Sequence, residues 1–93
     1  MFGMSKINRA EAEALLKPLF PESVQSKLNI AKYPKPTRYG LYTVWSASYH
    51  EGEIFVSAHY SNYSGRIYWA WWDDENKIWN ATLEAPEFLK AIS

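Results

Sequence analysis

One stretch, Arg66–Leu83, decides the fold of this chain, and it reads R-I-Y-W-A-W-W-D-D-E-N-K-I-W-N-A-T-L. It contains four of the five tryptophans and one compact acidic turn. Large apolar residues recur at alternate positions on both sides of that turn, as they do in the two strands of a β-hairpin. Because aromatic side chains dominate the energetics of protein cores, the register of this hairpin decides which rings form the core.

Two registers of the hairpin are open. A two-residue loop at Glu75–Asn76 pairs Trp72 with Trp79, and we expect it to exchange the roles of Trp71 and Trp72. A three-residue loop at residues 74–76 pairs Trp71 with Trp79 and consists of a type I turn followed by a left-handed residue, which asparagine tolerates. We prefer the three-residue loop because it places these residues on one apolar face: Ile67, Trp69, Trp71, Trp79, Ala81 and Leu83.

Composition favours a single folded domain over residues 1–93. The chain is 47% hydrophobic and 17% aromatic, which excludes disorder as a default. It has no cysteine, so it can form no disulfide and no thiolate metal site. Charged residues interrupt Met1–Phe20, which is therefore not a signal peptide, and no apolar run reaches membrane-spanning length. We therefore expect a cytoplasmic protein without a membrane partner.

The N-terminal third predicts two helices and a connector. Asn8 and Glu11 have the spacing of a capping box, and an apolar stripe at helical spacing follows them. Pro18 predicts the end of this helix, and Pro21 can open a second, short helix. The two prolines of Lys32–Arg38 hold that segment extended, and we interpret it as a surface connector.

From Tyr39 the period of the sequence changes from 3.6 to 2, which indicates strands. A hairpin turn at Glu51–Gly52 would pair Tyr49 with Ile54, Ala47 with Val56 and Trp45 with Ala58. Pro86 opens a short C-terminal helix. The expected fold is therefore α+β, with an N-terminal helix or helix pair, a four-stranded antiparallel β-meander and a short C-terminal helix.

The two faces of the predicted sheet differ in character. The inner face, which the helices cover, consists of Leu41, Trp45, Ala47, Tyr49, Ile54, Val56, Ala58, Tyr60, Ile67, Trp69, Trp71, Trp79, Ala81 and Leu83. The other face mixes rings with small hydroxyls, and its candidate partner-binding residues are Tyr42, Phe55, His59, Arg66, Tyr68 and Trp72. Alternatively, these rings stabilise the sheet as cross-strand pairs, or a helix covers this face too.

Motifs for catalysis or cofactor binding are weak. Ser57 and His59 share a face, but side chains two apart in a strand stand roughly 6–7 Å apart, and no acid is expected near the imidazole. The two histidines lack metal-ligand spacing, and Asp73–Glu75 has too few ordered oxygen ligands for Ca²⁺. We therefore expect no enzymatic activity, no metal and no cofactor.

The remaining function classes are binding functions. Our first expectation is a small protein-interaction or inhibitor protein, of a character that suits a phage or mobile element, which binds another protein or a second copy of itself through the aromatic face. The alternative is a single-stranded nucleic-acid binder that uses a basic, aromatic strip: Lys32, Tyr33, Lys35 and Arg38. Zero net charge and an acidic second half, with seven acids against three bases from Glu51 onward, argue against nucleic acid.

Overall fold

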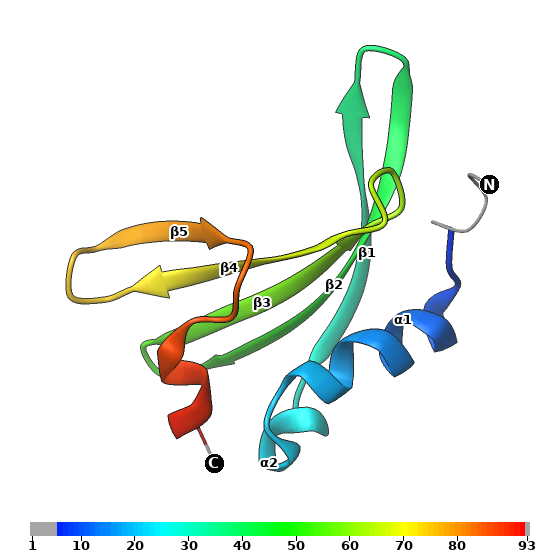
Figure 1. Cartoon of the computed structure of the whole chain (residues 1–93). Helices are drawn as coiled ribbons and strands as arrows, with labels where there is room; N and C mark the ends of the chain where they lie inside the picture. The colour runs from blue at the N-terminus through cyan, green and yellow to red at the C-terminus, as the bar shows by residue number, and fades with distance from the viewer. Residues whose placement is uncertain (1–5, 93) are drawn as a thin grey trace.

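A five-stranded antiparallel sheet and two short N-terminal helices make up an α+β fold, as the computed structural model shows for residues 6–92 (Figure 1). The single domain expected over residues 1–93 includes residues 1–5 and 93, which lie outside the described range. The strands follow one another in chain order across the sheet. The elements are α1 (Arg9–Leu16), the 3₁₀ turn η2 (Lys17–Leu19), α2 (Glu22–Gln25), β1 (Asn29–Thr37), β2 (Gly40–Glu51), β3 (Ile54–Ser61), β4 (Ile67–Asp73), β5 (Ile78–Thr82) and the 3₁₀ turn η3 (Glu87–Ala91).

The N-terminal helix begins as its sequence predicts. The Asn8 side chain accepts a hydrogen bond from the Glu11 backbone N–H (2.8 Å), and the Glu11 carboxylate accepts one from the Asn8 N–H (2.9 Å). These two bonds satisfy N–H groups that the first helical turn leaves without partners. Ala12 and Leu16 are fully buried, and α1 ends at Leu16, shortly before Pro18.

The expected connector Lys32–Arg38 is wrong: residues up to Thr37 form most of the edge strand β1, which raises the sheet from four strands to five. β1 pairs with β2 through its whole length, from Asn29 opposite Ser48 to Thr37 opposite Gly40. Pro34 and Pro36 are tolerated because they are two residues apart, so that their missing N–H groups fall on the same, unpaired edge. A proline in a strand excludes a central position but not an edge.

The β2–β3 hairpin keeps its predicted faces but not its predicted turn. Its turn is Gly52–Glu53, with Gly52 at φ +63°, and Tyr49 pairs with Val56 instead of Ile54. Pairing has therefore moved by two residues. Because side chains alternate with a period of two, the apolar residues of both strands still share a face.

The preferred register of the β4–β5 hairpin is wrong. Trp79 pairs with Trp72, and the last pair before the turn is Asp73 with Ile78. Residues 74–77 form the loop, and Lys77 is the left-handed residue, at φ +56°. This is the pairing of the rejected alternative, yet Trp71 and Trp72 do not exchange faces, because β4 is held by β3, where Val56 pairs with Trp71. The register instead turns Trp79 and Ala81 away from the predicted inner face.

The C-terminal element is a 3₁₀ turn, not the expected α-helix. Five residues after Pro86 are too few to establish several α-helical hydrogen bonds, and tertiary packing holds them instead. Leu89 and Ile92 are buried in the core, and the Phe88 ring lies edge-on to Trp71, with centroids 5.6 Å apart.

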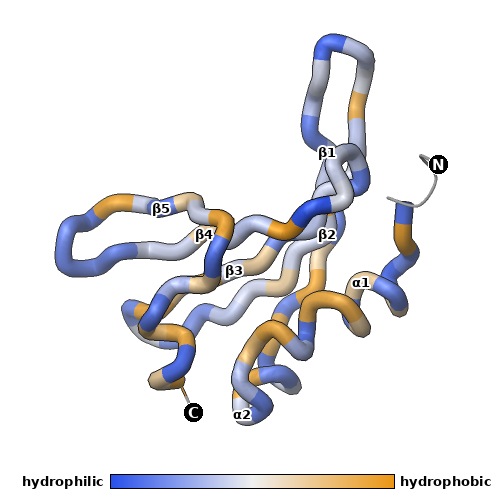
Figure 2. Tube along the Cα trace, viewed as in Figure 1, coloured by the Kyte–Doolittle hydropathy of each residue, from blue (hydrophilic) through white to orange (hydrophobic). Residues whose placement is uncertain are grey.

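The core lies on one face of the sheet, where α1, α2 and η3 gather (Figure 1). Hydrophobic segments of the helices and of the chain end line this side, whereas the tips of the β1–β2 and β4–β5 hairpins are hydrophilic (Figure 2). The buried residues of this core are Ala12, Leu16, Phe20, Val24, Ile30, Trp45, Ala47, Tyr49, Val56, Ala58, Tyr60, Trp69, Leu89 and Ile92.

Five residues expected in the core are instead exposed. Leu41 is 74% exposed because it lies near the tip of the long β1–β2 hairpin, which extends past the helices (Figure 1). Leu83 is 75% exposed and follows the end of β5. Trp79 and Ala81 are exposed because of the register, and Ile54 lies at the open β2–β3 turn. Within residues 6–92 no helix covers the opposite face of the sheet, which we call the open face.

Candidate functional site

The open face carries an aromatic cluster at the end where the β2–β3 and β4–β5 turns lie. We call His50, Phe55, Trp72 and Trp79 the tryptophan cluster. The Phe55 ring lies edge-on to Trp79 with centroids 5.0 Å apart, and Trp79 lies 5.5 Å from Trp72. His50 lies 4.8 Å from Phe55. Trp79 joins the two hairpins into one surface, and 53% of it is exposed to solvent.

A hollow of about 440 Å³ opens within the tryptophan cluster. Besides the four rings it is lined by the β2–β3 turn at Gly52 and Glu53 and by Asp74 from the β4–β5 turn. A second hollow of about 310 Å³ adjoins it at Trp72, and its lining adds Ile54, Phe88, Ala91 and Ile92. Aromatic walls with carboxylates at the rim therefore characterise this end of the sheet.

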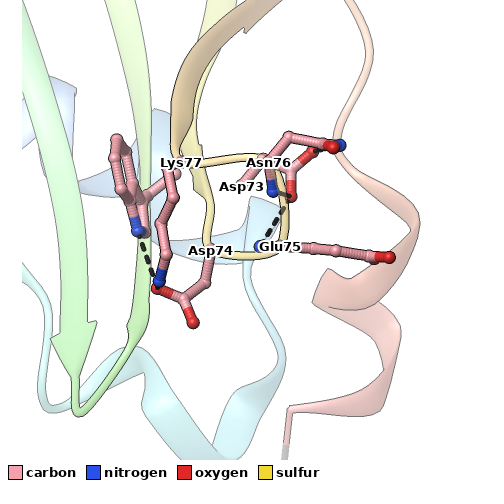
Figure 3. Close-up of polar contacts among 6 residues, drawn as sticks. Asp73, Asp74, Glu75, Asn76 and Lys77 are labelled. Atoms are coloured by element: carbon pink, nitrogen blue, oxygen red, sulfur yellow. Dashed lines mark hydrogen bonds and ion pairs between the residues drawn. The ribbon is translucent and has the colours of Figure 1, made fainter.

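The β4–β5 turn is held in place by its own polar groups (Figure 3). Asp73 Oδ1 accepts hydrogen bonds from the backbone N–H groups of Glu75 and Asn76, both at 3.1 Å, and Asp73 Oδ2 accepts one from the Asn76 amide at 2.8 Å. Hydrogen bonding to Asn76 holds the pKa of Asp73 below its ordinary value. A charged group that accepts three bonds fixes the loop conformation.

Asp74 ties the turn to the tryptophan cluster. Its Oδ1 accepts a hydrogen bond from Trp72 Nε1 at 3.2 Å and lies 2.9 Å from Lys77 Nζ. The hydrogen bond from Lys77, followed by that from Trp72, lowers the pKa of Asp74. The indole of Trp72 is thus oriented by the same carboxylate that lines the hollow.

A second group of side chains on the open face forms a hydrogen-bonded chain across β1, β3 and β4. The Tyr33 hydroxyl lies 2.8 Å from His59 Nδ1 and 3.2 Å from the Tyr68 hydroxyl. His59 Nε2 lies 2.7 Å from Ser57 Oγ, which donates to the Ala70 carbonyl at 3.3 Å. We call Tyr33, Ser57, His59 and Tyr68 the tyrosine–histidine network.

One tautomer satisfies the whole tyrosine–histidine network. Because Ser57 donates to a carbonyl, it accepts from Nε2–H of His59, which leaves Nδ1 to accept from Tyr33. Burial, and next the charge of Lys35, lower the pKa of His59 to about 4. Burial and then the hydrogen bond with Tyr68 raise the pKa of Tyr33. His59 and Tyr33 are therefore neutral at pH 7, and the hydrogen-bonded network braces the three strands.

The network corrects one expectation about Ser57 and His59. Their polar atoms are in hydrogen-bond contact, although they were expected to stand well apart. This contact does not make a nucleophile, because Ser57 is 5% exposed and the atom that orients the imidazole is the Tyr33 hydroxyl, not a carboxylate. The arrangement suits a structural role.

The sequence-predicted partner-binding residues fall into separate places. Phe55 and Trp72 belong to the tryptophan cluster, whereas His59 and Tyr68 stack on each other in the tyrosine–histidine network, with centroids 4.7 Å apart. Tyr42 lies in β2, and its ring centroid is 5.2 Å from that of Tyr63. Arg66 is exposed and directly precedes β4. Sequence reasoning missed Trp79, His50, Glu53 and Asp74; a correct β4–β5 register would have identified Trp79.

The predicted basic strip is divided between the two faces of the sheet. Lys32 Nζ lies over the Trp45 ring on the helix side, 5.5 Å from its centroid, whereas Lys35 Nζ lies 5.9 Å from the Tyr68 centroid on the open face. Tyr33 is bound within the tyrosine–histidine network, and Arg38 is exposed at the β1–β2 turn. The four residues therefore do not form one continuous track for a nucleic-acid backbone.

Across residues 6–92, no group of three or more histidine, aspartate or glutamate side chains is arranged to hold a metal ion. In the same range, none of the helices has the length and hydropathy required to cross a membrane.

No protein-family model, no curated protein sequence and no solved structure matched this chain.

Proposed function

We propose that this chain is a non-enzymatic protein-binding domain whose contact surface is centred on the tryptophan cluster. The observation that carries the proposal is that Trp79 is half exposed between Phe55 and Trp72, on a face that no helix among the described residues covers. A fully buried aromatic side chain removes about 150–250 Å² from water, and tryptophan is enriched at the energetic centres of protein interfaces. Three adjoining rings provide such a centre.

The charges around the cluster favour a basic partner. Glu53 and Asp74 line the hollow, and Glu75 lies beside Asp74 in the β4–β5 turn. Glu51 and Asp73 end the strands β2 and β4 that lead into the two turns. Acidic rims steer a basic surface toward contact and raise the association rate. They also repel phosphate, which supports a protein partner over a nucleic acid.

The same charges argue against a second copy of this chain as the partner at this surface. In a two-fold symmetric contact each patch meets itself, so the acidic rim would face another acidic rim. Like charges placed opposite one another across an interface disfavour association. We therefore propose a different protein as the partner, and a domain that covers such a surface on another protein can act as its inhibitor.

The experiment is affinity capture from the native host with three baits: the wild type, Trp79→Ala and Tyr39→Ala. Tyr39 is the matched control because it is 83% exposed and lies in the β1–β2 turn, away from the tryptophan cluster. We expect the partner to be recovered with the wild type and with Tyr39→Ala, and to be lost with Trp79→Ala. Equal recovery with all three baits would refute the assignment of the surface.

A further inference from the structure

The hollow of the tryptophan cluster combines two features that together select a ligand. Its walls are the rings of Phe55, Trp72 and Trp79, and its rim holds the carboxylates of Glu53 and Asp74. We propose that it binds an arginine side chain of the partner protein. This inference rests on the proposed function and names the chemical group that the surface recognises.

The aromatic walls of the hollow favour a planar cation as the ligand. The ring quadrupole attracts a cation placed over its face, and tryptophan attracts it most strongly. The planar guanidinium also stacks on such faces and is more weakly hydrated than an ammonium group. Trp79 offers the exposed face for this contact, and its position against Phe55 and Trp72 holds the ring in one orientation.

The carboxylates of Glu53 and Asp74 provide hydrogen-bond acceptors for such a cation. Glu53 and Asp74 line the same hollow from different hairpins. Glu53 is exposed and the Asp74 side chain is 38% exposed, so a ligand can reach both. A guanidinium presents five N–H donors in a fixed fork, and its paired bonds to carboxylates are roughly twice as strong as bonds between neutral groups.

The chain already places one of its own cations at this rim. Lys77 Nζ lies 2.9 Å from Asp74 Oδ1, and the hydrogen bond to Asp74, with a contribution from the charge of Glu53, raises the pKa of Lys77. The Lys77 side chain is 67% exposed, and exposed ion pairs are weak, so a ligand can displace it. Lys77 therefore shows that the rim attracts a cation, and it competes with the incoming arginine.

The test uses capped tripeptides as probes: acetyl-Gly-Arg-Gly-amide, its lysine analogue and its citrulline analogue. Binding is followed by NMR through the indole N–H signals of the tryptophans. We expect the arginine peptide to bind at least about threefold more tightly than the lysine peptide. Only the guanidinium group can stack on an aromatic ring and also donate paired hydrogen bonds to a carboxylate. The citrulline peptide keeps the planar shape without the charge and should bind about tenfold more weakly than the arginine peptide. Equal affinity for the arginine and citrulline peptides, or for the arginine and lysine peptides, would overturn the assignment.

Three variants of the chain sharpen the test. Asp74→Asn should weaken binding of the arginine peptide by about fivefold, while Glu75→Gln, the same loss of charge one residue away and outside the lining of the hollow, should change it by less than about twofold. Lys77→Met, which removes the competing cation, should strengthen binding by about twofold. Equal effects of Asp74→Asn and Glu75→Gln would reduce the site to general electrostatic attraction and refute it.

The peptide result can be separated from the fate of the proposed function. If the partner captured by the wild type is lost with Trp79→Ala but retained with Asp74→Asn, the surface binds a protein and the arginine assignment fails. If Trp79→Ala also retains the partner, the proposed function itself fails.

Discussion

Trp72 and Trp79 pair directly across β4 and β5, with ring centroids 5.5 Å apart. This pairing turns Trp79 toward the open face and, through its contact with Phe55, connects the β4–β5 hairpin to the β2–β3 hairpin. The aromatic stretch that organises the chain therefore serves both sides of the sheet. Trp69 contributes to the core, and Trp79 contributes to the exposed surface.

Replacing Trp69 and Trp79 by alanine should have very different effects on stability. Trp69 is buried and packs on Phe20 with centroids 5.3 Å apart, so Trp69→Ala should lower the free energy of unfolding by about 3–5 kcal/mol. Trp79→Ala loses mainly exposed ring contacts and should cost about 1 kcal/mol. Urea denaturation of both variants measures the difference, and similar losses would mean that Trp79 is a core residue.

Stability should fall between pH 6.5 and pH 4 because of His59. Its pKa in the folded protein, about 4, lies below the ordinary value of 6.5, so the unfolded chain binds the proton more readily across this window. A fully buried group with this shift would contribute about 3 kcal/mol, and solvent screening of the partly exposed ring reduces the expected loss to about 1–2 kcal/mol.

The measurement is the free energy of unfolding as a function of pH, with His59→Gln as the control. Asp73 and Asp74 also have lowered pKa values, but their contribution is lost below the ordinary value of 3.8 and so at more acidic pH. His59→Gln should flatten the profile between pH 5 and pH 6.5. An unchanged slope in that variant would show that His59 is not the titrating group.

The prolines of β1 should protect that edge of the sheet from pairing with other chains. Pro34 and Pro36 have no N–H to offer at the unpaired edge. A variant with both prolines replaced by threonine restores those donors, and we expect it to self-associate more strongly than the wild type in sedimentation equilibrium. The same association constant for both proteins would contradict this role.

Single-stranded nucleic acid should not bind at micromolar protein concentration. Lys32 and Lys35 lie on opposite faces of the sheet, and the exposed rings of the open face are bordered by acids. Electrostatic attraction to phosphates supplies most of the affinity for nucleic acid. Here the basic residues are divided between two faces, and the acids beside the rings repel phosphates. An anisotropy titration with labelled oligo-dT at low salt provides the measurement; saturable binding would revive the nucleic-acid alternative.

Local sequence patterns predicted the parts of the fold that depend on local chemistry. The capping box at Asn8 correctly predicted the start of α1. The alternation of apolar residues correctly predicted which side chains of β2, β3 and β4 share a face. Alternation survives a shift of pairing by two residues, which is why the displaced turn at Gly52 did not disturb the core.

The remaining features depend on contacts between distant residues. The prolines of Lys32–Thr37 exclude this segment from the centre of a sheet but allow it at an edge. Pairing with β2 makes it an edge strand and not a connector. The position of Trp79 depended on which residue of the turn is left-handed, and lysine is an unusual choice for that conformation. The Tyr33–His59 contact joins residues 26 positions apart, so no local sequence pattern predicts it.

The most direct test of the tryptophan cluster as a binding surface is the dissociation constant of the captured partner for Trp79→Ala and for Tyr39→Ala. Loss of a central interface tryptophan costs about 2 kcal/mol or more, so Trp79→Ala should raise the dissociation constant at least about 30-fold, while Tyr39→Ala should change it less than about twofold. A Trp79→Ala variant that is folded and binds as tightly as the wild type, or as tightly as Tyr39→Ala, would contradict the assignment.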